Sequence, residues 1–437
     1  MSRISYAPQI AEIADDRAML GRRAGRFMRW LAIAAVASLF LISPLMLYDL
    51  GFNYVGAGGN IFEKVHPGTW AMLLTLVLGG VGRGNPLRMF DDFVASRAMV
   101  IYLLSVAALF AYTILVRKTP FTPWIDTYLM PAFLYVIVTK MCEGDRKATA
   151  LTIQALLGAN ALLGIYETTT GYRFSTYTAG EFLIETDWRA TSLLGHPLAN
   201  AMASGSYIII LALGGGRDLP KLACPLMIGL QLFAMISFGG RSSLVLTLLM
   251  ILIIGIYRMA RFAMGAPMDF RQAGMTLLAM PLFGVALAYA ASGGFFDRMA
   301  ERFINDNGSA KARVVMLELY DYFSWEDLLL GPDPERIGTL QYMLGIEYGI
   351  ESFWVALTIG NGILISLILF LGLACLSWRI VAVTRPAAVI LLLYFYVLAS
   401  SAVSISTKSV TLGLFMAMVM TMLRPDAPTS LAPARRA

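Results

Sequence analysis

The feature that most constrains this chain is a series of apolar runs, each about as long as a bilayer is thick. The runs lie at residues 28–49, 66–82, 97–116, 122–140, 147–167, 194–214, 219–237, 241–258, 273–293, 350–376, 386–404 and 408–424. A helix of about twenty apolar residues crosses a hydrocarbon core. Charged residues make up only 14% of the chain and its mean hydropathy is +0.69, whereas a soluble domain carries about 25% charged residues. We predict an all-α polytopic membrane protein with about twelve transmembrane helices.

Lys and Arg predict the orientation of these helices. They concentrate in the amino-terminal tail, in every second connection, as with Arg83, Lys140 and Arg217, and at the end of the chain from Arg424. Cytoplasmic connections carry such an excess, so we expect both termini in the cytoplasm. The net charge of +6 is accounted for by this orientation and predicts no nucleic-acid partner.

The connections divide the chain into five parts. We predict a cytoplasmic tail at 1–27, transmembrane helices 1–9 at 28–293, and a large periplasmic loop at 294–349 between helices 9 and 10. Helices 10–12 then occupy 350–424, and a second cytoplasmic tail occupies 425–437. The large loop contains amphipathic stretches at Phe295–Ile304 and Val314–Phe323. Loops this long are usually functional or disordered, and aromatic content argues against disorder. We therefore expect short helices on the outer membrane face.

Two arginines stand at the expected outer face. Arg189 precedes the sixth apolar run and follows Trp188. This position fits either an interfacial anchor or a cation at the mouth of an outward cavity. Arg241 follows two glycines on a short turn and is followed by Ser242. Glycines allow close backbone approach and a helix amino terminus carries partial positive charge, so this turn predicts an anion site.

Two histidines and an acidic residue lie at the same face. His66 and His196 each precede a proline at the start of an apolar run, which fits either a helix cap or a substrate contact. Glu351 starts the tenth run among apolar residues, where it fits either a helix amino terminus or a proton acceptor with a raised pKa. Arg313 starts an apolar helical pattern in the large loop. The sequence contains no metal-binding or nucleotide-binding motif, and we predict neither a metal nor a cofactor.

Three local features resemble the O-antigen ligase and Wzy-type polysaccharide polymerase superfamily. They are the Thr191–Asn200 segment with its Gly-His-Pro sequence, the Gly240–Ser243 turn, and the region from Arg313 through Glu351-Ser352-Phe353-Trp354 to Gly360–Ile363. The amino-terminal third is most similar to exopolysaccharide polymerases of the VpsF type. The ligases of this superfamily carry a His-Asn pair where this chain has Glu351-Ser352, which favours the polymerases.

The resemblance implies a GT-C-like fold and glycosyl transfer at the periplasmic face of a bacterial inner membrane. The implied donor is an undecaprenyl-diphosphate-linked oligosaccharide and the acceptor is a lipid-linked repeat unit, with inversion at the anomeric carbon and without a metal. Arg189 and Arg241 would be catalytic cations and Glu351 the base. Arg313, His196, Ser242 and His66 would contact substrate, with His196 as a substitute base. Further partners would be the lipid bilayer, a chain-length regulator and export machinery.

Two alternatives remain open from the sequence. A ligase would move finished glycan to another acceptor. A polysaccharide or lipid flippase would carry its charged residues within a central cavity rather than at the outer face.

Overall fold

The structure is a computed structural model that describes residues 26–425, except 57, 177, 180, 181, 184–187, 268, 269, 297–308, 347, 348 and 403. The helices of the first part are α2 (Arg26–Leu41), α3 (Pro44–Asp49), α4 (Pro67–Gly82), α5 (Met89–Val94), α6 (Arg97–Tyr112), α7 (Thr122–Trp124), α8 (Met130–Lys140) and α9 (Glu143–Thr170). Those of the second part are α10 (Pro197–Ala212), α11 (Ala223–Phe238), α12 (Arg241–Ala263), α13 (Phe270–Ser292), α15 (Ser309–Glu318), α16 (Trp325–Leu330), α17 (Pro334–Met343), α18 (Phe353–Asn361), α19 (Ile363–Val383), α20 (Ala388–Ala399) and α21 (Thr411–Met422).

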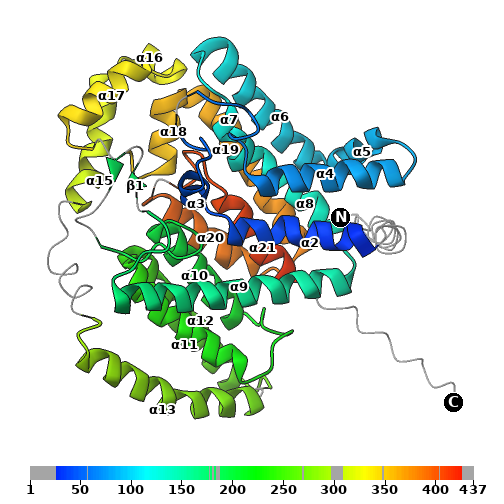
Figure 1. Cartoon of the computed structure of the whole chain (residues 1–437), viewed down its shortest axis with the longest axis vertical. Helices are drawn as coiled ribbons and strands as arrows, with labels where there is room; N and C mark the ends of the chain where they lie inside the picture. Colours follow the sequence, from blue (N-terminus) through cyan, green and yellow to red (C-terminus); the bar gives the residue numbers. More distant parts are fainter. Residues whose placement is uncertain are drawn as a thin grey trace.

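Shorter elements complete the described chain. Four of them are short 3₁₀- or π-helical turns: η1 (Pro86–Arg88), η2 (Thr113–Arg117), η3 (Ile125–Leu129) and η4 (Leu319–Tyr322). One antiparallel hairpin pairs β1 (Thr178–Ala179) with β2 (Phe182–Leu183). The architecture is otherwise a bundle of helices (Figure 1).

Every predicted apolar run contains a helix, which confirms the helical class. Among the described residues, four helices are long and apolar enough to cross a membrane: Arg97–Arg117, Glu143–Thr170, Arg241–Ala263 and Ile363–Val383. Their outward side chains are apolar too, as Leu252 and Ile253 of α12 are 59% and 50% exposed. Large apolar side chains turned outward suit lipid rather than water. The apolar helices indicate a membrane-embedded protein, and the count of twelve spans stays a prediction.

The predicted helix over 350–376 is two helices in the structure. Its first residues are not helical, and α18 ends at Asn361, before α19 begins at Ile363. Gly362 between them has φ +90°, and a Cβ there would lie 2.6 Å from the backbone nitrogen of Gly331. A residue with a side chain rarely adopts this φ. The helix therefore breaks where the backbone of the large loop packs against it.

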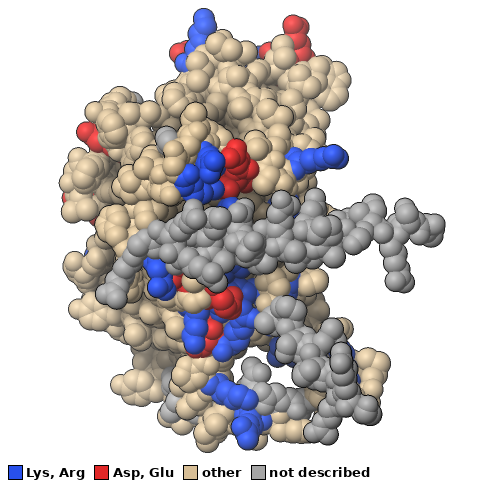
Figure 2. Space-filling view, turned by 90° about the vertical axis from the view of Figure 1, so that its right-hand side faces the viewer, with Lys and Arg blue, Asp and Glu red and all other residues tan. Residues whose placement is uncertain are grey.

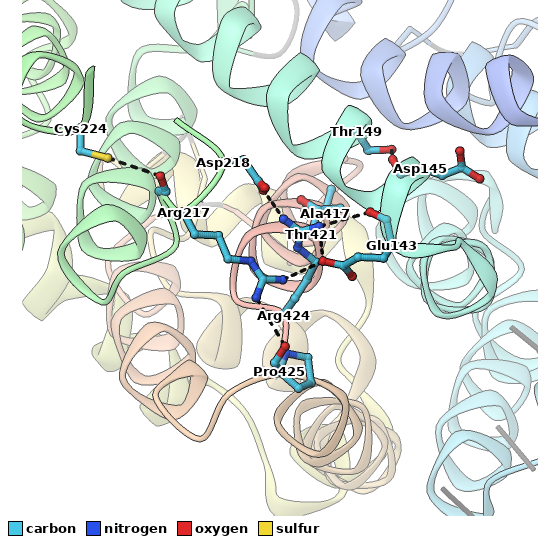
Figure 3. Close-up of polar contacts among 11 residues, drawn as sticks. Glu143, Asp145, Thr149, Arg217, Asp218, Cys224, Ala417, Thr421, Arg424 and Pro425 are labelled. Carbon is cyan, nitrogen blue, oxygen red and sulfur yellow. Dashed lines mark hydrogen bonds and ion pairs between the residues drawn. The ribbon is translucent and has the colours of Figure 1, made fainter. Parts of the chain in front are cut away.

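One end of the bundle, called here the Arg424 end, is tied by ion pairs between distant helices. Arg29 pairs with Asp145, Arg83 and Lys140 both pair with Asp92, and Arg424 pairs with Glu143 and Asp218. Figure 2 shows Lys, Arg, Asp and Glu side chains gathered on the face at the right of Figure 1. Figure 3 shows Arg424 between Glu143 and Asp218, with Arg217 beside them. Several of the connections that carry the predicted cytoplasmic charges thus meet at one end, and the side of the membrane that this end faces stays a prediction.

The opposite end, called here the loop end, carries the segments before α10 and α12 and the large loop. Helices α15, α16 and α17 share a small core of their own that includes Met316, Leu328 and Ile337 and extends to Val355 of α18. The Arg117 guanidinium donates to the carbonyl oxygens of Gly331 at 2.7 Å and Pro332 at 2.6 Å. The predicted short helices of the large loop are confirmed for Val314–Phe323, and most of Phe295–Ile304 lies outside the described residues.

Candidate functional site at the loop end

The segment ahead of α10 is held by a buried carboxylate. Glu167, in the last turn of α9, is fully buried. Its Oε1 accepts the backbone N–H of Phe174 at 2.7 Å, and its Oε2 accepts those of Thr191 at 2.7 Å and Ser192 at 3.0 Å. Hydrogen bonds to a charged acceptor are about twice as strong as neutral ones. Glu167 therefore fixes the path of the chain on both sides of the long connection between α9 and α10.

Two asparagines complete this support. The Asn160 side-chain oxygen accepts the backbone N–H of Leu193 at 3.0 Å, and the Asn200 amide donates to the carbonyl oxygen of Thr191 at 2.6 Å. Ser192 has φ +46°, an uncommon conformation for a residue other than glycine. Backbone strain of this kind persists where the surroundings fix the conformation and is frequent at functional sites.

Arg189 and His196 flank this rigid turn and lie close to each other. Both side chains are half-buried. His196 caps α10 through Nδ1, which accepts the backbone N–H of Leu198 at 3.2 Å. Burial, and then the positive charge of Arg189, lower the pKa of His196 to about 4. His196 is therefore neutral near pH 7, and because Nδ1 accepts the capping hydrogen bond its proton is on Nε2. Its predicted roles as a substrate contact and substitute base stay predictions.

The turn that carries Arg241 packs against the Arg189 segment. The backbone N–H of Ala190 donates at 3.2 Å to the carbonyl oxygen of Ser237, two residues before Gly239 of the Gly239-Gly240 turn. A Cβ on Gly240 would lie 2.5 Å from the Cβ of Ala201. Glycine thus allows the start of α12 to approach α10, and it places Arg241 and Arg189 on adjacent segments.

The start of α12 is suited to an anion. Its N-cap is Gly240, which has no side chain to cap the first amides, and half-buried Arg241 and Ser242 follow. The partial positive charge at a helix amino terminus adds to that of the arginine. Around this turn, within the described residues, the buried atoms Asn160 Nδ2, Asn200 Oδ1 and Ser237 Oγ have no hydrogen-bond partner. Buried polar atoms of this kind are usually satisfied by water or a ligand.

Arg313 and Glu351 form a second pair. Arg313 Nε lies 3.5 Å from Glu351 Oε2, and their side chains are 37% and 36% exposed. Glu351 is thus partly buried and lies just before α18, which begins at Phe353. Both expected roles, at a helix amino terminus and as a proton acceptor, stay open. The pairing joins the large loop to the start of α18.

His66 takes no part in this site. It is fully buried, its Nδ1 accepts the backbone N–H of Gly68 at 3.0 Å, and its Nε2 lies 2.7 Å from the carbonyl oxygen of Ile42. Both ring nitrogens are engaged, which leaves none for the substrate contact predicted from the sequence. The histidine caps α4 and joins it to the chain after α2.

A buried carboxylate beside His66 was missed by the sequence reasoning. Asp126 accepts hydrogen bonds from Tyr54 Oη at 2.8 Å, Thr69 Oγ1 at 2.6 Å and the backbone N–H of His66. Lys408 Nζ lies 3.6 Å from the centroid of the Tyr54 ring. Asp126 and Glu167 could both have been singled out from the sequence, because each is an ionisable residue within an apolar run.

Comparisons with family models, with curated proteins and with solved structures find no match to this chain. The described residues contain no cluster of His, Cys, Asp and Glu suited to a metal ion. The site is thus defined by its own geometry: two arginines, a neutral histidine and an uncapped helix start on adjacent segments, and an Arg–Glu pair in the large loop.

Proposed function

We propose that this chain is a membrane glycosyltransferase that polymerises a secreted polysaccharide. It transfers an undecaprenyl-diphosphate-linked glycan to a lipid-linked repeat unit at the periplasmic face of the bacterial inner membrane. The observation that best supports the proposal is the packing of the Arg189–His196 segment against the Arg241 turn. The resemblance of the Thr191–Asn200 and Gly240–Ser243 sequences to the polymerases supports the same reaction.

The cations suit the leaving group of this reaction. The acceptor hydroxyl oxygen attacks the anomeric carbon, the bond from that carbon to the phosphate oxygen breaks, and undecaprenyl diphosphate leaves with the electron pair. Negative charge therefore grows on the diphosphate. Arg189, Arg241 and the amides of Ser242 and Ser243 in the first turn of α12 would stabilise that charge, as fixed donors stabilise developing oxyanions in other enzymes.

Glu351 remains the candidate base. The acceptor hydroxyl loses its proton as the new bond forms, and the partly exposed Glu351 carboxylate can receive it. Arg313, 3.5 Å away, would hold the Glu351 carboxylate in place or contact a substrate phosphate.

The test begins with lipid-linked glycan extracted from a strain that lacks this chain. Single repeat units are expected, and long unattached chains would instead identify a ligase. The extracted repeat units are then supplied to the purified protein in proteoliposomes, and the products are separated by length. The wild-type protein should produce a ladder of lipid-linked chains, whereas transport without bond formation would identify a flippase.

Two arginine variants of α12 make the test specific. Arg241→Ala should lower the rate of chain growth by about 100-fold or more, the usual effect of removing one donor to a developing oxyanion. Arg258→Ala removes the same charge from an exposed position near the other end of the helix and should leave the rate unchanged. A normal ladder from Arg241→Ala would contradict the proposed site.

A further inference from the structure

A cavity lies at the Arg424 end, away from the proposed site. It is lined by residues of α2, α4, α5, α8 and α9 and is open to the surface. Its enclosed part measures only about 40 Å³, so a bound molecule would lie largely in the open mouth, along the lining side chains.

The lining of the cavity changes from charged to apolar along each helix. Its apolar part includes Ala32 of α2, Leu76 of α4 and Val136 of α8. Its charged part includes Arg29, Arg83 and Lys140, each nearer to the Arg424 end of its helix. A molecule that fits this lining has a charged head and an apolar tail.

The charges favour an anionic head. The carboxylates that line the cavity are Asp92 and Asp145, and their side chains are 8% and 7% exposed. Asp92 pairs with both Arg83 and Lys140, each at 2.8 Å. Among the described residues, the lining cations outnumber the carboxylates by one, and the Arg29 side chain is 48% exposed. One phosphodiester charge would balance the excess.

Apolar side chains on the outside of the same helices place the cavity beside lipid. Trp30 of α2 is 63% exposed, and Leu74 and Val81 of α4 are 48% and 53% exposed. Basic pockets between transmembrane helices commonly hold anionic lipid head groups. We propose that this cavity binds one anionic phospholipid, with its phosphodiester at Arg29 and Lys140 and the start of an acyl chain along Leu76 and Val136.

Gly79 supplies a precise test because it lines the cavity and a Cβ there would meet nothing within 4 Å. Gly79→Leu fills the apolar part of the cavity without backbone strain. Gly82→Leu is the matched control, since Gly82 lies in the same helix, has equally open space and does not line the cavity. Lys140→Gln removes one cation.

Binding is measured by native mass spectrometry of the purified full chain in detergent, titrated with dioleoylphosphatidylglycerol or dioleoylphosphatidylcholine. The wild-type protein and Gly82→Leu should retain one phosphatidylglycerol more tightly than phosphatidylcholine. Gly79→Leu and Lys140→Gln should each weaken retention by about tenfold. Equal retention of phosphatidylglycerol by Gly79→Leu and the wild type would overturn the assignment. Displacement of the bound lipid by sn-glycerol 3-phosphate at the same concentration would also overturn it, because a head group alone would then suffice for binding.

Discussion

Replacing Glu167 tests how the Arg189 segment is positioned. Its carboxylate accepts three backbone N–H groups, one at Oε1 and two at Oε2. Glu167→Gln keeps the shape but replaces one oxygen by an amide nitrogen, which cannot accept a hydrogen bond. Hydrogen bonds to charged groups contribute about 1.5–3 kcal/mol each. At 1.4 kcal/mol per factor of ten, loss of one such bond should speed exchange of the affected amides by about 10- to 150-fold.

Hydrogen–deuterium exchange of the detergent-solubilised protein measures this effect. Peptides that cover Phe174 and Thr191–Ser192 should lose protection in Glu167→Gln, while peptides of α19 should not change. Glu318→Gln, at an exposed position of α15, is the control for the substitution itself. Unchanged exchange at Thr191 and Ser192 in Glu167→Gln would refute the positioning role, and a uniform rise throughout the chain would show global destabilisation instead.

Two further predictions concern the scaffold. Gly362→Ala should lower the free energy of unfolding by about 2 kcal/mol or more, because φ is +90° and a Cβ would meet the Gly331 backbone. Gly360→Ala is the control, since a Cβ there meets nothing within 4 Å. Thermal unfolding should show no comparable loss of stability for this control. Arg424→Ala should cost about 3–5 kcal/mol, because Arg424 and Asp218 are 1% and 9% exposed and the aspartate loses its partner. The double variant with Asp218→Ala should be more stable than Arg424→Ala alone, and a less stable double variant would contradict this reasoning.

The sequence was sufficient to predict the helices because their signal is local. Apolar runs of bilayer length define where helices form, and the structure contains a helix in each. The break at Gly362 was not predicted, because its cause is the backbone of Gly331, thirty-one positions earlier. Nothing within the run from 350 to 376 carries that information.

The site was predicted in part for the same reason. Arg189, Arg241 and His196 stand at helix starts, so topology alone suggested one face, and the structure brings their segments together. The roles of Glu167 and Asp126 depend on backbone N–H groups from distant segments, which no sequence pattern displays. His66 and His196 both precede a proline, yet only the structure distinguishes them, because both ring nitrogens of His66 are engaged within the fold.

In the proposed reaction the loop end binds a lipid diphosphate through Arg189 and Arg241. A structure of the protein with undecaprenyl diphosphate bound tests it most directly. Phosphate oxygens are expected within about 4 Å of the guanidinium nitrogens of Arg189 or Arg241, the usual limit for an ion pair, beside the start of α12. Phosphates bound elsewhere, with both arginines out of reach, would contradict it.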